Sequence, residues 1–225
     1  MFEHLLQLPL FQGMSPEALT ALVEKYRFHF LKYHDGDTIV EVGETCTHIR
    51  FVVSGAARVV MRCRHQNVTI SQTLVAPHVL GADSLFGLDT TYPFTAVSVG
   101  TCGILQIAKT DYVTMLQSNK VLLFNILNHL SRGAQMLTTS LLAMQHGDVA
   151  ERLMRWVTAL TTRSSQDVHI HFVQRDLCCL LAASRKTLIA AINHLEEAGL
   201  ITHHQNEIQV LDLRSMRDTA TSSVS

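Results

Sequence analysis

The chain has 225 residues, of which 47% are hydrophobic, so it is long enough for one large domain or two modest ones. Its formal net charge of -1 excludes the strong basic field by which composition alone would indicate nucleic-acid binding. No stretch approaches the roughly 18 uninterrupted apolar residues of a membrane-spanning helix, so we expect no membrane partner.

The chain contains five cysteines, none of them in a CxxC spacing: Cys46, Cys63, Cys102, Cys178 and Cys179. This odd, scattered set indicates neither a disulfide framework nor a zinc or iron–sulfur site, and it is typical of a reducing compartment. The first residues carry Glu3 and no Lys or Arg before a short apolar run, which is wrong for a signal peptide. We therefore expect a cytoplasmic protein.

The first half of the chain is predicted to be rich in strands. Ser15 can cap a short helix that has Pro16 at its first position. From residue 28 onward, short β-branched runs recur about every ten residues. Turn signals separate several of these runs: Asp35-Gly36-Asp37, Gly43-Glu44, Ser54-Gly55 and Gly100. The pattern predicts an antiparallel sandwich or barrel over about residues 25–108.

Helices follow, first a short one around residues 111–117 and then a long proline-free segment over about residues 119–145. Such a helix is on the order of 40 Å long, which is more than one small barrel can cover. We expect it to pair with a copy of itself, and the alternative is a core helix that lies across the barrel. Its apolar residues alternate steps of four and three: Leu123, Leu127, Leu130, Ala134, Leu137, Leu141 and Met144.

The last third of the chain has the order of a winged helix-turn-helix. Gly147 ends the long helix, and Asp148 can cap the next one, predicted over residues 151–161. An alternating strand over residues 167–172, two helices over residues 174–182 and 184–198, and two strands around a turn at 205–207 complete the order.

The second helix of this pair carries two cations and two hydroxyls on its first turn. In a helix-turn-helix these residues meet base edges in the major groove, and the free N–H groups of the helix attract phosphate. Arg185 is expected to pair with guanine O6 and N7, and the neighbouring hydroxyls and lysine with phosphates. The alternative is a solvated helix end with Ser184 as its cap. The predicted DNA-contacting residues are Ser184, Arg185, Lys186, Thr187, Ile189, Ala190 and Asn193.

The opposite face of this helix is apolar and is expected to pack on the preceding helix. The residues predicted to lie on that face are Leu188, Ala191, Ile192, Leu195 and Ala198, and their expected partners are Leu177, Leu180 and Leu181.

Four motifs, "LPLFQGMSPEAL", "DGDTIVEVGE" with its following "VVSGAARVV", "GDVAERL" and "VQRDLCCLLAASRKTL", resemble the CRP/FNR family of bacterial transcription regulators. The resemblance extends over essentially the whole chain. It implies an α+β fold with three parts: a cyclic-nucleotide-binding-like β-roll sensor (residues 1–110), helices and a hinge for dimerisation (111–147) and a DNA-binding domain (148–225). It also implies a homodimeric, effector-responsive regulator, not an enzyme, with palindromic double-stranded DNA and RNA polymerase as partners.

Two positions in the motif depart from the family pattern. Lys186 stands where the family usually has an acidic residue, and a lysine cannot accept a hydrogen bond from cytosine N4. The resemblance therefore implies an operator that differs from the usual half-site. Val173 stands where family members commonly have Thr, which removes a cap and a phosphate contact.

The effector is not identified by the sequence. The family's nucleotide-binding cassette pairs Gly-Glu-Leu with a later Arg-Ser/Thr-Ala, and both anchors are missing here. No Lys or Arg occurs between His65 and Ala108, while Arg58, Arg62 and Arg64 lie outside this segment. We therefore expect an unknown small-molecule effector that does not use the usual cyclic-AMP anchors. The candidate pocket consists of Leu80, Gly81, Ala82, Asp83, Phe94, Thr95 and Ala96.

The alternative is a haem, metal or thiol-based redox sensor on the same fold. His78 is a candidate haem ligand. A strand face with His169 and His171 beside His203 and His204 would permit a metal, and the pair Cys178-Cys179 would permit a thiol switch. The sequence has no recognisable catalytic motif, and it assigns no cofactor, catalytic residue or metal ligand.

Overall fold

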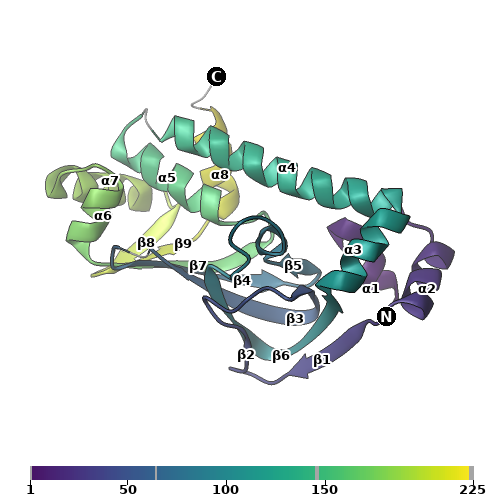
Figure 1. Ribbon diagram of the computed structural model, residues 1–225. Coiled ribbons are helices and arrows are strands. Elements are labelled where there is room, and N and C mark those ends of the chain that lie inside the picture. The colour runs from purple at the N-terminus through teal and green to yellow at the C-terminus, as the bar shows by residue number, and fades with distance from the viewer. Residues whose placement is uncertain (1, 64, 145–146, 223–225) are drawn as a thin grey trace. The chain divides into compact units, whose positions relative to one another are not determined.

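The computed structural model describes residues 2–63, 65–144 and 147–222 (Figure 1). The chain forms two compact units, which are described separately. The first contains Met1–Val59 and Leu74–Gly133, and the second contains Val60–Thr73 and Ala134–Ser225. The antiparallel strands, the long helix and the C-terminal helical domain confirm the α+β class that the sequence predicts.

The first unit begins with helices. Ser15 accepts a hydrogen bond from the Ala18 amide at 3.2 Å, and Pro16 occupies the first helical position, which confirms the predicted start of α2. The elements before the strands are α1 (Phe2–Gln7), η1 (Pro9–Phe11) and α2 (Pro16–Lys25).

The strands of this unit form an antiparallel roll. β6 lies between β1 and β3 and also pairs with β2, whereas β5 pairs with β3. The elements are β1 (His29–Tyr33), β2 (Thr38–Val40), β3 (His48–Arg62), the end of β4 (Val68–Val75), β5 (His78–Leu80), η2 (Ala82–Ser84), β6 (Phe94–Ala108) and α3 (Lys109–Ser118). The helix α4 (Lys120–Ala143) follows and belongs to the first unit up to Gly133.

Two turns expected from the sequence are absent, because β3 runs through Ser54-Gly55 and β6 runs through Gly100. Gly55 has a φ of +74° and Gly100 a φ of +64°, so both adopt a conformation that favours glycine. A Cβ on Gly55 would collide with the Thr101 carbonyl of the neighbouring strand. These glycines therefore bend long strands and do not end them.

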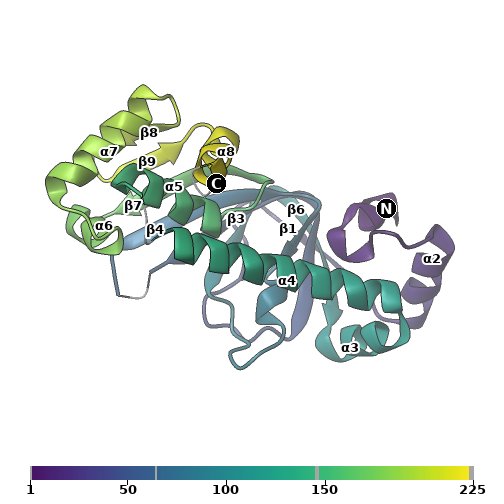
Figure 2. The same cartoon turned by 90° about the horizontal axis from the view of Figure 1, so that it is seen from above.

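The second unit is a winged helix-turn-helix that includes the hairpin between β3 and β4 (Figure 2). Its strand order is β4-β7-β9-β8, and β7 and β9 are antiparallel. The elements after the end of α4 are α5 (Val149–Leu160), β7 (Ser165–Phe172), α6 (Gln174–Leu180), α7 (Arg185–Glu197), β8 (Ile201–His204), β9 (Glu207–Val210) and α8 (Leu213–Ser222). The sequence predicts all of these except α8.

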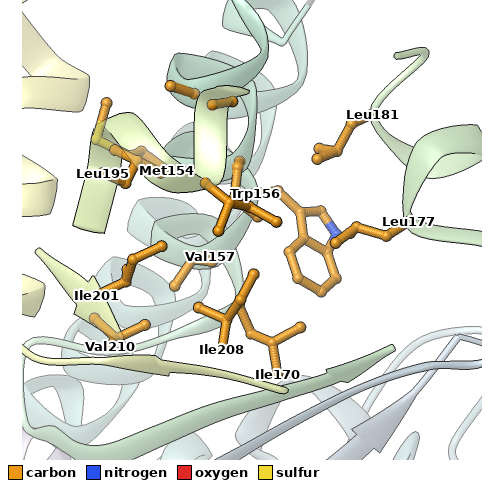
Figure 3. Packing of buried hydrophobic residues seen from close by; sticks show 14 of the residues in the cluster. Met154, Trp156, Val157, Ile170, Leu177, Leu181, Leu195, Ile201, Ile208 and Val210 are labelled. Atoms are coloured by element: carbon orange, nitrogen blue, oxygen red, sulfur yellow. The ribbon is translucent and has the colours of Figure 1, made fainter. Parts of the chain in front are cut away.

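One apolar cluster holds this unit together (Figure 3). Trp156 of α5 lies next to Leu177 of α6, and Ile170 and Ile208 enter from the sheet. α5 begins as expected, because the Asp148 carboxylate accepts the Glu151 amide at 2.8 Å. Within the described residues, no helix combines the length and apolar character needed to cross a membrane.

Replacing Ile170 by Ala tests this core. Ile170 is completely buried, so Ile170→Ala should lower the free energy of unfolding by about 2–5 kcal/mol, measured by urea denaturation. Leu211→Ala is the control, because Leu211 is exposed and its truncation should cost less than about 0.5 kcal/mol. Equal effects of the two variants would contradict the assignment of the core.

Candidate nucleic-acid interface

The first turn of α7 is built around its cap. Ser184 has an extended backbone, and its Oγ accepts the Thr187 amide at 3.2 Å. The Thr187 hydroxyl donates to the Ser184 carbonyl at 2.9 Å, and the two hydroxyl oxygens lie 3.0 Å apart. Both hydroxyls therefore serve the cap. The amides of Arg185 and Lys186 precede the first intrahelical hydrogen bonds and point out of the helix end.

The two faces of α7 differ as the sequence predicts. Leu188, Ile192 and Leu195 are buried and pack in the cluster around Trp156. Ala198 is wrongly placed in the predicted apolar face, because it forms the exposed C-cap of the helix. All residues of the predicted DNA-contacting set are exposed: Ser184, Arg185, Lys186, Thr187, Ile189, Ala190 and Asn193.

The preceding helix supports α7 from the expected side. Leu177 and Leu181 are buried in the cluster, and Leu180 is partly buried against it. Val173 precedes α6 and provides no side-chain cap, as the sequence indicates. Its amide donates instead to the Asn67 carbonyl at 2.9 Å. This partner comes from the hairpin between β3 and β4, which local sequence patterns do not reveal.

The wing consists of β8 and β9 with a turn at Gln205, whose φ is +52°. On the neighbouring strand, His169 is held by two carboxylates. Its Nε2 lies 2.8 Å from Asp167 Oδ1, and its Nδ1 lies 2.6 Å from Glu207 Oε1. His203 stacks instead on Phe172, with ring centroids 6.1 Å apart. Both ring nitrogens of His169 are therefore paired with carboxylates, and His169 and His203 do not face a common site as the predicted metal site would require.

Partial burial of His169 opposes its protonation, but the hydrogen bonds and charges of Asp167 and Glu207 outweigh this effect. Together they raise the pKa of His169 above its ordinary value. Across the described part of the chain, no group of three His, Cys, Asp or Glu residues has an arrangement that could hold a metal ion.

The roll brings together several residues of the candidate effector pocket. Gly81 has a φ of +59°, and a Cβ there would lie 2.7 Å from Tyr92 Cε1 and 3.3 Å from Phe94 Cζ. The Thr95 hydroxyl accepts the Val42 amide at 3.3 Å. Leu80, Ala82, Phe94 and Ala96 are buried, Gly81 and Thr95 are partly buried, and Asp83 is exposed.

Arg50 is a buried cation of the roll that the sequence analysis missed. Only 9% of it is exposed, and its guanidinium donates to Tyr92 Oη at 3.1 Å and to Glu44 Oε1 at 3.1 Å. A third bond reaches Gln106 Oε1 at 3.4 Å. Each guanidinium nitrogen thus has a partner within the roll. A cation inside the apolar run "HIRFVV" is the sequence signal that could have identified it.

The other basic residues near the roll do not replace the arginine of the family's nucleotide-binding cassette, which this chain lacks. Arg58 and Arg62 are exposed, and Arg64 lies outside the described residues. His78 is more buried than Arg58 and Arg62. This burial lowers the pKa of His78 to about 4, and the charge of His129 is a smaller cause. Its imidazole is therefore neutral at neutral pH. Cys178 is partly buried and Cys179 is exposed, and both are free thiols.

The predicted dimer seam of α4 is largely exposed in the single chain. Leu137 is 53% exposed and Leu141 is 66% exposed, and together with the other exposed apolar residues of the seam they form the kind of surface that marks an interaction site. Leu123, Leu127 and Ala134 are also exposed, while Leu130 is partly buried. Met144 lies one residue beyond the end of α4 and packs partly against the core cluster of the second unit.

Two family models match the chain. A cyclic nucleotide-binding domain matches residues 30–119, and a Crp-like helix-turn-helix domain matches residues 149–219. The cAMP-activated global transcriptional regulator CRP of Haemophilus influenzae is 24% identical over 191 residues, which cover 83% of this chain and 85% of that protein.

Solved structures show the same fold. The catabolite activator protein of Thermus thermophilus has a TM-score of 0.53 at 20% identity and covers 95% of this chain and 99% of its own. A CooA mutant from Carboxydothermus hydrogenoformans has a TM-score of 0.50 at 16% identity and covers 92% of both chains.

The roll, the long helix and the winged helix-turn-helix together have the fold of a DNA-binding transcription regulator, and the matched regulators are not enzymes. The two family models cover more than two thirds of the chain. The protein belongs to the CRP/FNR family.

The pairing of His169 predicts a pH-dependent stability. Because its folded-state pKa lies above its unfolded value of 6.5, its contribution is fully present below that value and is lost as the pH rises through the raised pKa. His169→Gln should therefore destabilise the protein more at about pH 6 than at about pH 9 in urea denaturation. Glu207→Gln should reduce the difference, and equal losses for His169→Gln at both pH values would refute the pairing.

Proposed function

We propose that the protein is a homodimeric, sequence-specific DNA-binding regulator that acts in the cytoplasm on a palindromic operator. The observation that carries this proposal is that the first turn of α7 is exposed. The opposite face of the helix is buried in the core of the second unit, which fixes its orientation. We assign the functional parts of the protein to residues 1–110, 111–147 and 148–225, as the sequence predicts, whereas the two compact units divide the chain at other positions. RNA polymerase is the partner through which such a regulator would act.

Within the proposed interface the contacts have separate roles. The Arg185 side chain reads a guanine edge, because its planar guanidinium matches O6 and N7. Lys186 and the exposed helix amides hold phosphates. Since Ser184 and Thr187 use their hydroxyls in the cap, we assign them mainly the task of fixing the helix end. Ile189, Ala190 and Asn193 extend the surface along the helix.

The proposed dimer is formed by α4. Its seam exposes several large apolar residues in one line, and a second copy of the helix would cover them. A twofold pair of α7 helices would then contact two half-sites one helical turn apart.

The proposed effector is an unknown small molecule that does not use the anchors by which the family usually binds cyclic AMP. The Haemophilus relative is described as cAMP-activated, but Ala82 and Phe94 stand here at the positions of the anchoring Glu and Arg, and Arg50 is engaged with partners of its own. A haem, metal or thiol sensor is the second candidate. The residues that would serve it are His78, whose imidazole is neutral at neutral pH, and the free thiols of Cys178 and Cys179. A haem band in the absorption spectrum of the purified protein, bound metal by elemental analysis, or loss of DNA binding on thiol oxidation would favour the second candidate.

Arg185→Ala tests the reading of DNA. A duplex pool with random half-sites should select one preferred base opposite Arg185 in the wild type, and the variant should lose that preference at a cost of about 1–3 kcal/mol per half-site. Lys186→Ala should weaken all duplexes uniformly and reduce the salt dependence. His194→Ala, on a later turn of α7, is the control. An unchanged base preference in Arg185→Ala would contradict the proposal.

Leu137→Glu tests the dimer. A carboxylate in the seam would lose its hydration on pairing, so sedimentation velocity should show a dimer for the wild type and a monomer for the variant. Thr139→Glu introduces the same charge on the opposite side of α4 and should remain dimeric. A monomeric wild type, or a dimeric Leu137→Glu, would exclude this interface.

A further inference from the structure

The hairpin between β3 and β4 is part of the DNA-binding unit, although it lies about 80 residues before that domain in the sequence. Val68 and Ile70 are almost fully buried and belong to the same apolar cluster as Trp156. β4 also lies next to β7 in the sheet. The winged helix-turn-helix is therefore completed by a segment that the C-terminal family model does not include.

Asn67 at the end of the hairpin turn makes three hydrogen bonds to the start of α6. Its backbone amide and its side-chain Nδ2 both donate to Asp176 Oδ2 at 2.9 Å. Its carbonyl accepts the Val173 amide, also at 2.9 Å. One residue thus binds both a backbone group before α6 and a side chain in its first turn.

Asp176 depends on this contact. Only 7% of the residue is exposed, and it is the acidic group in the first turn of α6. The Asn67 hydrogen bonds, the backbone one first, lower the pKa of Asp176, and Arg175 Nε at 3.3 Å from Oδ1 adds to the effect. Asn67 supplies two hydrogen bonds to this carboxylate, whereas Arg175, whose side chain is 83% exposed, supplies one. A desolvated carboxylate without these donors would be strongly disfavoured.

The base of the hairpin is fixed as well. Gln72 is 4% exposed, and its Nε2 donates to the Leu160 carbonyl at the end of α5 at 2.8 Å. The Ser165 hydroxyl donates to Gln72 Oε1. The hairpin is thereby attached both to the end of α5 and to the start of α6.

We propose that Asn67 is a positioning residue for DNA recognition, because it holds α6 in the place where α6 supports α7. The inference rests on the proposed DNA-binding function. Asn67 does not touch DNA in this account. It acts through Asp176 and the packing of Leu177 and Leu181 under α7.

The test is a reciprocal exchange. Asn67→Asp places a second carboxylate against Asp176, and it should weaken binding to the selected duplex by about tenfold or more and speed amide hydrogen exchange in α6. Combined with Asp176→Asn, it should recover binding to within about threefold of the wild type, since an amide again faces a carboxylate. Recovery in the double variant would assign the loss of binding to this contact, and faster exchange confined to α6 would separate a local displacement of α6 from a general loss of stability.

Gln66→Glu is the matched control, because it adds the same charge at the neighbouring position of the turn and should leave binding and exchange unchanged. If Asn67→Asp does not fold, Asn67→Ala retains both backbone bonds and should still show about a threefold loss of binding and faster exchange in α6. Wild-type binding by Asn67→Asp or Asn67→Ala, or no recovery in the double variant, would overturn the inference. An unchanged base preference in Arg185→Ala would mean that the proposed DNA binding itself has failed. If Arg185→Ala behaves as expected but the Asn67 variants bind like the wild type, only the inference about Asn67 has failed. Hydrogen exchange in α6 tests the contact between Asn67 and Asp176 without DNA.

Discussion

Burial of the apolar face of α7 is the interaction on which the C-terminal unit depends. Leu188, Ile192 and Leu195 are held in a cluster with Trp156, and this fixes the rotation of the helix about its axis. The capped first turn with Arg185 then has to face outward. A surface that reads DNA needs side chains held in one orientation, and here the core provides that orientation.

The same core extends beyond the helix-turn-helix itself. Val68 and Ile70 bring a hairpin from the first half of the chain into the cluster, and Asn67 connects that hairpin to α6. The strands that carry the hairpin continue into the roll. In the roll, the buried guanidinium of Arg50 is paired with the carboxylate of Glu44 and hydrogen-bonded to Tyr92, so this cation is held in the interior and not presented at the surface as Arg185 is.

Features with local causes could be predicted from the sequence. Ser15, Asp148 and Ser184 each cap the helix that the sequence assigns to them, since a cap involves residues only three positions apart. The glycines of β3 and β6 were misassigned as turns, because only the neighbouring strand shows that the chain bends and continues. The contact of Asn67 with Asp176 spans 109 positions and leaves no local pattern.

Hydroxyl-radical footprinting on a duplex selected from a random pool tests the account most directly. The account predicts two protected patches on one face of the duplex, related by a twofold axis and centred about 10 base pairs apart. A single protected patch, or a pair without twofold symmetry, would contradict a dimer that presents two α7 helices to successive major grooves.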